Sequence, residues 1–145
     1  MQEMQNSVLT SVLADIESET PVTSKRRHVR QQAENLILYV APVRIAGDMP
    51  SYASFFPVRC RDLSSGGVGF FMPAKPSFKM LVVQLGSHHK AIYMEATVRH
   101  TGIAPALPEK QQAWDANGKE FYIELGSSPF VVGCQFLERL DATPW

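Results

Sequence analysis

Residues 25–30 have the sequence KRRHVR and place four cationic side chains within six positions. The chain of 145 residues has 14 basic and 14 acidic residues, so this is a local concentration of charge. Arg26 and Arg30 have the spacing RxxxR. An arginine guanidinium can bind a phosphate, or the O6 and N7 atoms of guanine, through paired hydrogen bonds. The run therefore predicts either a solvated basic linker or a binding element for an anionic ligand.

A second set of polar residues, in the stretch RDLSSGG, has the spacing DxSxxG and consists of Asp62, Ser64 and Gly67. A carboxylate can accept two parallel hydrogen bonds from N1–H and N2–H₂ of guanine, a serine hydroxyl can donate or accept, and a glycine lets a ring approach the backbone. Alone, the motif also fits a polar turn in which Asp and Ser cap amides and the glycine has positive φ. Together, the two motifs predict a site for an anionic guanine nucleotide.

The two motifs, in this order, resemble the PilZ domain, a bacterial receptor module for cyclic di-GMP. Asp62 follows Arg30 by 32 positions, and DLSSGGVGF is close to the typical sequence of the family at this motif. VGCQFLERL, with Gly133 three positions before Phe136, is similar to its closing strand. The resemblance covers about residues 25–140.

The resemblance implies a role for each matching residue. Arg26 and Arg30 would bind the phosphates and the O6/N7 edge of guanine, with Lys25 and Arg27 adding charge. Asp62 would bind the donor edge of guanine, Ser64 would hydrogen-bond nearby, and Gly67 would keep the turn open for the base. The implied function is a signal-transduction receptor that binds cyclic di-GMP, closes the RxxxR loop over it, and passes a conformational change to a protein partner.

The segments that contain and surround the two motifs are predicted to be β-strands. Alternating and continuous apolar stretches separated by turn signals, with no helical period between them, predict an all-β fold. We expect an antiparallel six-stranded β-barrel, as in PilZ domains, with a short N-terminal helix. The expected strands cover residues 34–46 with a break near Pro42, and 55–63, 67–73, 78–86, 91–102, 119–126 and 130–140. The strands at 78–86 and 91–102 should form a hairpin.

Residues 4–17 have apolar side chains at the spacing of one helix face, and residues 18–24 are polar and contain Pro21. The predicted organisation is an N-terminal helix and linker (1–24), a PilZ-like barrel (25–140) and a C-terminal tail (141–145). This helix is expected to be the element that passes the signal on, or the surface on which a partner docks.

Two features depart from the family: no C-terminal helix follows the barrel, and the 101–132 connection is long. Trp114 in that connection is expected to pack on its own scaffold.

Other features restrict the function. The balanced charge argues against general nucleic-acid binding. No run approaches the roughly 20 apolar residues of a membrane span, and the first residues lack the pattern of a secretory signal, so we expect a soluble, cytoplasmic protein. Cys60 and Cys134 read as buried thiols, and His88 and His89 as part of a solvated turn. His100 lies at a strand end near the expected site and receives no role.

Three functions remain. The first is the cyclic di-GMP receptor, with no cofactor and no catalysis. The second is a PilZ-like adaptor that acts by protein contacts without ligand; the intact motifs argue against it. The third is a small barrel enzyme acting on nucleotides. The sequence contains no nucleophile–base pair, metal-binding cluster or paired carboxylates that would support an enzyme.

Overall fold

The computed structural model of the chain describes residues 36–104, 113–122 and 129–144, together with Leu9, Val12, Leu13, Ile16, Gln31 and Gln32. The RxxxR run and most of the N-terminal segment lie outside these residues.

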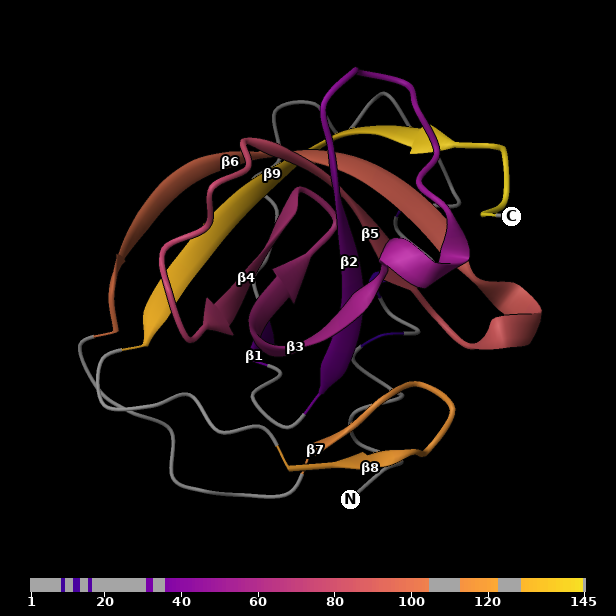
Figure 1. The fold of residues 1–145 in the computed structure, drawn as a ribbon. Coiled ribbons are helices and arrows are strands. Elements are labelled where there is room, and N and C mark those ends of the chain that lie inside the picture. The colour runs from indigo at the N-terminus through magenta and orange to yellow at the C-terminus, as the bar shows by residue number, and fades with distance from the viewer. Residues whose placement is uncertain are drawn as a thin grey trace.

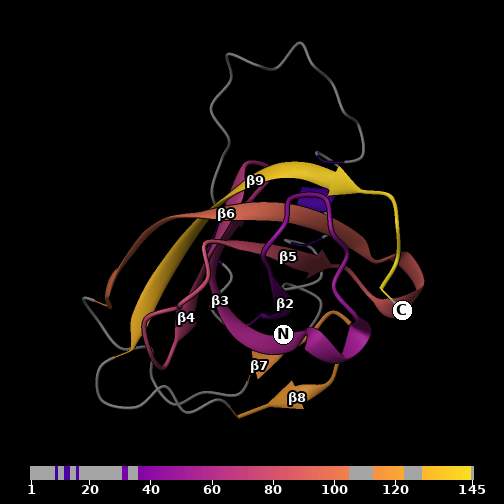
Figure 2. The same cartoon turned by 45° about the horizontal axis from the view of Figure 1, so that its top comes forward.

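Six antiparallel strands form a closed barrel in the order β3–β2–β5–β6–β9–β4, and the pairing of β4 with β3 closes the ring (Figure 1). The strands are β2 (Ile37–Val43), β3 (Phe56–Ser64), β4 (Gly67–Met72), β5 (Met80–Leu85), β6 (Ile92–Ile103) and β9 (Phe130–Leu140). The long strands β6 and β9 run side by side and curve around one side of the barrel (Figure 2). The predicted all-β barrel is therefore confirmed.

The core of the barrel is formed by inward-facing aliphatic and aromatic side chains of all six strands. Successive residues of a strand point to opposite faces, so about every second residue is available for the interior. The largest core side chain is Phe70, which is completely buried. Cys60 and Cys134 are buried in the same cluster, as the sequence predicts.

The N-terminal segment contributes to this core. Leu9, Val12, Leu13 and Ile16 have helical backbone conformation, and Leu9 and Val12 belong to the buried cluster. Leu13 and Ile16 pack against it. The spacing of these four residues is that of one helix face, as expected from the apolar pattern. The remainder of the expected helix and linker lies outside the described residues.

The expected break at Pro42 is wrong. β2 continues through Pro42 to Val43 and pairs with β5 over this stretch, with Pro42 opposite Leu81. The ladder between β2 and β3 ends earlier, at Val40 opposite Phe56. Because β2 has only one neighbour beyond Val40, a residue without an N–H can be accommodated there.

The stretch 119–126, expected to be a strand of the fold, is not part of the barrel in its described portion. Its described part forms β8 (Glu120–Phe121), which pairs with β7 (Ala113–Trp114) in a separate two-stranded sheet. β6 already pairs with β9 from Tyr93 to Ile103, so the edge that a strand from this connection could join is occupied. The hairpin expected between β5 and β6 is confirmed, with the 3-10 turn η3 (His88–Lys90) at its end.

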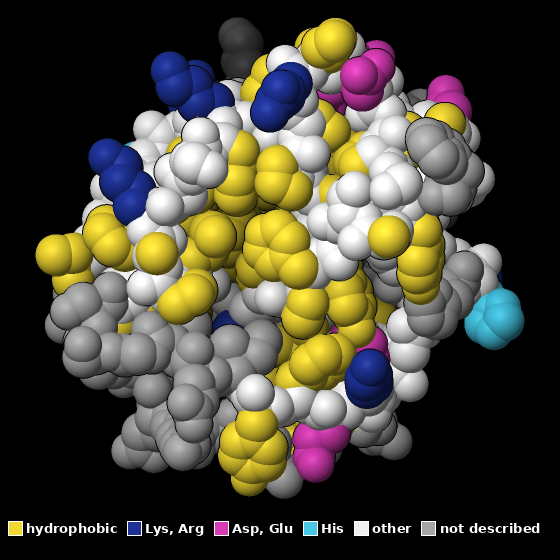
Figure 3. All heavy atoms as spheres, viewed as in Figure 1, with side chains coloured by type: hydrophobic (Ala, Val, Ile, Leu, Met, Phe, Trp, Pro, Cys, Tyr) yellow, Lys and Arg dark blue, Asp and Glu magenta, His cyan; other side chains and the backbone are white. Residues whose placement is uncertain are grey.

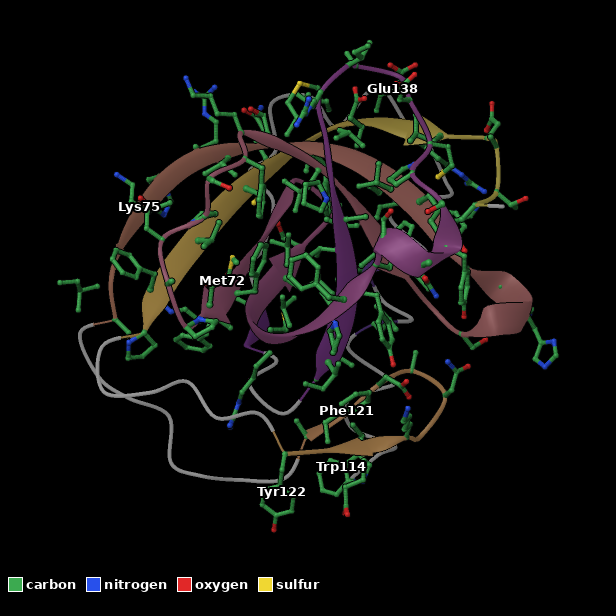
Figure 4. The ribbon with its side chains drawn as sticks, viewed as in Figure 1. Met72, Lys75, Trp114, Phe121, Tyr122 and Glu138 are labelled. Carbon is green, nitrogen blue, oxygen red and sulfur yellow. The ribbon has the colours of Figure 1, made fainter. Side chains whose placement is uncertain are left out.

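A buried carboxylate joins the β7–β8 hairpin to the barrel. The Tyr39 hydroxyl of β2 donates a hydrogen bond of 2.7 Å to Oδ2 of Asp115. Oδ1 of Asp115 accepts the backbone N–H groups of Asn117 and Lys119 at 2.9 and 2.8 Å. Trp114 is half-buried, its backbone forms a bridge with Leu36, and its side chain lies near that of Tyr122 in Figure 4.

Replacing Tyr39 with phenylalanine is expected to lower the free energy of unfolding by about 1–2 kcal/mol, because it leaves the buried Asp115 without one donor. Chemical denaturation monitored by circular dichroism measures the change. Tyr122→Phe is the matched control, since Tyr122 is 64% exposed and should leave the stability unchanged. Equal stability of Tyr39→Phe and wild type would contradict a stabilising role for this hydrogen bond.

Alkaline pH tests the same contact. Burial, and then the Asp115 carboxylate, raise the pKa of Tyr39 far above its ordinary value. A phenol whose pKa is raised on folding stabilises the fold below the unfolded pKa of about 10, and this contribution is lost as the pH rises above it. Wild type should therefore lose stability above about pH 10 more steeply than Tyr39→Phe.

Candidate ligand-binding site

The DxSxxG motif lies at the hairpin that joins β3 to β4. Ser64 pairs with Gly67, and Ser65 and Gly66 form the turn between them. The Ser64 hydroxyl accepts the Gly66 N–H at 3.2 Å, which is the turn-capping role expected of a serine at this point. Gly67 begins β4. Among the described glycines, positive φ occurs at Gly47, Gly86 and Gly118, so Gly67 lacks the positive φ of the alternative polar-turn interpretation.

Asp62 lies two residues before Ser64 on β3 and pairs with Gly69 of β4. Its carboxylate occupies the space above that glycine. A Cβ atom added to Gly69 would lie 2.8 Å from Oδ1 of Asp62, closer than side chains tolerate. The absence of a side chain at Gly69 therefore allows the half-buried carboxylate to approach β4 closely, with Oδ1 nearest.

The same row continues across the sheet. Gly69 pairs with Gly133 of β9, and Gly133 pairs with His100 of β6. The His100 imidazole lies over Gly133, because an added Cβ there would clash with its Cε1 and Nε2 atoms. Directly paired residues of antiparallel strands share a face. The side chains of Asp62 and His100 therefore come from two different strands and cover two paired glycines, Gly69 and Gly133. We call Gly69 and Gly133 the glycine floor.

Each end of this row carries a β-bulge with an arginine as the extra residue. On β3, Cys60 pairs with Phe70 and Asp62 with Gly69, which leaves Arg61 unmatched. On β6, Val98 pairs with Cys134 and His100 with Gly133, which leaves Arg99 unmatched. Both arginines are exposed. Bulges redirect side chains and are frequent next to functional sites. Two exposed arginines are therefore the chain neighbours of Asp62 and His100, and their charge favours an anionic ligand.

The predicted RxxxR residues Arg26, Arg27 and Arg30 lie outside the described residues. The chain that follows them is placed: β1 (Gln31–Gln32) begins one position after Arg30 and pairs with the end of β3. Gln32 is opposite Asp62 and Gln31 is opposite Leu63. The first two residues after the RxxxR run are therefore beside the DxSxxG motif.

Sequence reasoning did not identify Gly69, Gly133 or the two bulge arginines as site residues, and it gave His100 no role. Gly69 was visible as the third glycine of SGGVG, and Gly133 as part of the closing-strand pattern. Their common row was not visible, because it depends on the pairing of four strands and on the two bulges.

Other surface features are separate from this row. A hollow of about 600 Å³ lies between the end of β2 and the start of β5, and its lining contains none of the predicted site residues. Hydrophobic side chains gather in the middle of the face shown in Figure 3.

In the described ranges, no three His, Cys, Asp or Glu side chains are grouped to hold a metal ion. No helix among the described residues has the length and apolarity needed to span a membrane.

No protein-family model and no curated protein matches this sequence. Solved structures do match this chain. The structure of the PilZ domain of YcgR from Escherichia coli with c-di-GMP matches with a TM-score of 0.43 and 15% identity, over 78% of each chain. MrkH, described as a c-di-GMP-dependent transcription regulatory factor, matches with a TM-score of 0.43 and 17% identity over 77% of this chain.

A complex of K. pneumonia MrkH with c-di-GMP matches with a TM-score of 0.41 and 15% identity, over 77% of this chain. The present chain spans 43% of the length of each MrkH chain. The structural neighbours are therefore proteins described with c-di-GMP, one of them named as a PilZ domain.

Proposed function

We propose that this protein is a receptor for cyclic di-GMP, which it binds on the outer face of β3 and β4 and reports to a protein partner. The observation that carries the proposal is the position of Asp62. Its carboxylate lies over a glycine, and Gln32, two positions after the RxxxR run, is its neighbour on β1. The proposed guanine-reading carboxylate therefore lies on the strand beside β1, and β1 begins one position after the proposed phosphate-binding arginines.

The chemistry of the ligand follows from these groups. Asp62 accepts the N1–H and N2–H₂ donors that distinguish guanine from adenine. Arg26 and Arg30 bind the phosphates and the O6/N7 edge of a base, and Arg27 adds charge. Ser64 holds the β3–β4 turn, and Gly67 keeps this part of β4 without a side chain. Arg61 and Arg99 contribute further positive charge near the row.

The conformational change is proposed to begin in the RxxxR loop. Its cations repel one another without ligand, and bound phosphates neutralise them and favour one ordered arrangement. The loop is connected through residues 18–24 to the segment whose Leu9 and Val12 are part of the barrel core. An ordered loop would therefore reposition a segment that a protein partner can read.

Calorimetric titration with cyclic di-GMP tests the proposal, with cyclic di-AMP and GTP as controls. We expect saturable binding of cyclic di-GMP alone. Chromatography of the ligand after prolonged incubation should return it unchanged, since the protein is proposed to be a receptor and not an enzyme. Absence of binding by a folded sample would reject the receptor and favour a ligand-independent adaptor.

Arg30→Ala is expected to raise the dissociation constant for cyclic di-GMP by about 10- to 100-fold, since it removes charge-assisted hydrogen bonds to the ligand. Titration calorimetry measures the change, and circular dichroism checks that the barrel is folded. Lys75→Ala is the matched control: Lys75 is an exposed cation after β4, outside the row (Figure 4). Normal binding by Arg30→Ala would refute the assignment of the RxxxR run.

A further inference from the structure

The His100 imidazole is seated on the backbone of Gly133. The Cβ position of Gly133 lies within contact of Cε1, Nε2 and Nδ1, the last at 3.0 Å. If the ring met the glycine with one edge only, Nδ1 would be much farther away than its two neighbours. The ring therefore covers the glycine with one face. His100 is nevertheless exposed to solvent, so its other face is open.

The open ring lies next to the Asp62 carboxylate. Gly69 and Gly133 are paired, and paired positions of antiparallel strands have Cβ positions about 5 Å apart. One of these positions is covered by the carboxylate and the other by the imidazole. The two groups therefore cover neighbouring positions on one face of the sheet, although they come from β3 and β6, which are not adjacent in the barrel.

We infer that His100 is a base-stacking residue of the ligand site. A guanine that lies parallel to the sheet on the open face of the imidazole presents its N1–H and N2–H₂ edge to Asp62. The base is then held by its face and by its edge at the same time. This inference rests on the proposed function and adds a residue that determines how the base is oriented.

The two glycines are necessary for this arrangement. A side chain at Gly133 would lift the imidazole from the sheet, and a side chain at Gly69 would displace the carboxylate. The bulge at Arg99 is necessary as well. Its extra residue changes the register of β6 against β9, so that His100, and not its neighbour, is paired with Gly133.

His100→Ala and His100→Phe separate stacking from other roles. Stacking of a base on an aromatic ring is lost with alanine, so the dissociation constant for cyclic di-GMP should rise about 10-fold. Phenylalanine retains a flat ring and should bind within about 3-fold of wild type. His89→Ala, at an exposed histidine in η3, is the matched control and should bind as wild type does.

Gly133→Ala tests whether the His100 ring must lie directly on the Gly133 backbone. We expect a loss of affinity similar to that of His100→Ala. Adding His100→Ala to Gly133→Ala should cost nothing further, because both changes remove the same stacked ring. In wild type, the His100 Hε1 resonance should move upfield during titration with ligand, as expected for a proton facing a stacked purine. A purely structural histidine would show neither the non-additivity nor the shift.

The outcomes distinguish this inference from the proposed function. If wild type binds cyclic di-GMP and Asp62→Ala does not, but folded His100→Ala binds as wild type does, the inference is rejected and the receptor stands. If folded wild type does not bind, both are rejected. If His100→Phe loses as much affinity as His100→Ala, the imidazole acts by hydrogen bonding and the stacking role is wrong.

Discussion

Replacing Asp62 with alanine is expected to raise the dissociation constant for cyclic di-GMP about 100-fold. The change removes a carboxylate that is proposed to accept two hydrogen bonds from guanine, each to a charged group and each contributing about 1.5 kcal/mol or more. The preference for cyclic di-GMP over cyclic di-AMP should fall as well, because the adenine edge lacks those donors. Titration of both ligands measures the two effects.

Two variants control this experiment. Asp62→Asn retains the shape and one acceptor oxygen and should lose about 10-fold in affinity, while Asp48→Ala removes an exposed carboxylate from another loop and should bind normally. Thermal unfolding shows whether the barrel is intact. If Asp62→Ala weakens both cyclic dinucleotides equally, Asp62 acts on the fold of the hairpin and does not read the base.

Val12→Asp is expected to lower the free energy of unfolding by more than about 3 kcal/mol. Val12 is 1% exposed and belongs to the barrel core cluster, so the variant places a carboxylate where it has no solvent and no designed partner. Val12→Ala removes only two methyl groups and should cost about 1–2 kcal/mol. Denaturant titration compares the three proteins.

Leu137→Asp is the control for the charge, since Leu137 is 50% exposed on β9 and should tolerate the change with little effect. The result also bears on signalling. A large effect of Val12→Asp means that the N-terminal segment and the barrel share one cooperative core, which is the contact through which the proposed movement of the RxxxR loop would act. Unchanged stability of Val12→Asp would show that the segment is not packed in the barrel in solution.

Much of the fold follows from local patterns. The strands at β3, β4, β5, β6 and β9 were predictable because each is an apolar run bounded by Gly, Pro, Ser or Asn, and because short turns force consecutive strands to pair. The helical face of Leu9, Val12, Leu13 and Ile16 was predictable from its spacing. The composition of the two motifs, together with their order, was enough to suggest the ligand class.

The remainder depends on pairings between residues far apart in the chain. Residues 119–126 have the composition of a strand, yet the described part forms a separate hairpin, because β6 and β9 pair with each other and leave no free edge between them. The pattern also suggested an interruption at Pro42, but a proline is tolerated where one neighbouring strand is missing.

The candidate site shows the same division. The residue types in DxSxxG were readable from the sequence, since carboxylate, hydroxyl and glycine chemistry belongs to the individual residues. The row that joins Asp62 to His100 was not readable. It depends on two bulges and on three strand pairings between positions 62, 69, 133 and 100. A shift of one residue turns every side chain to the opposite face, so only the assembled barrel determines which groups meet.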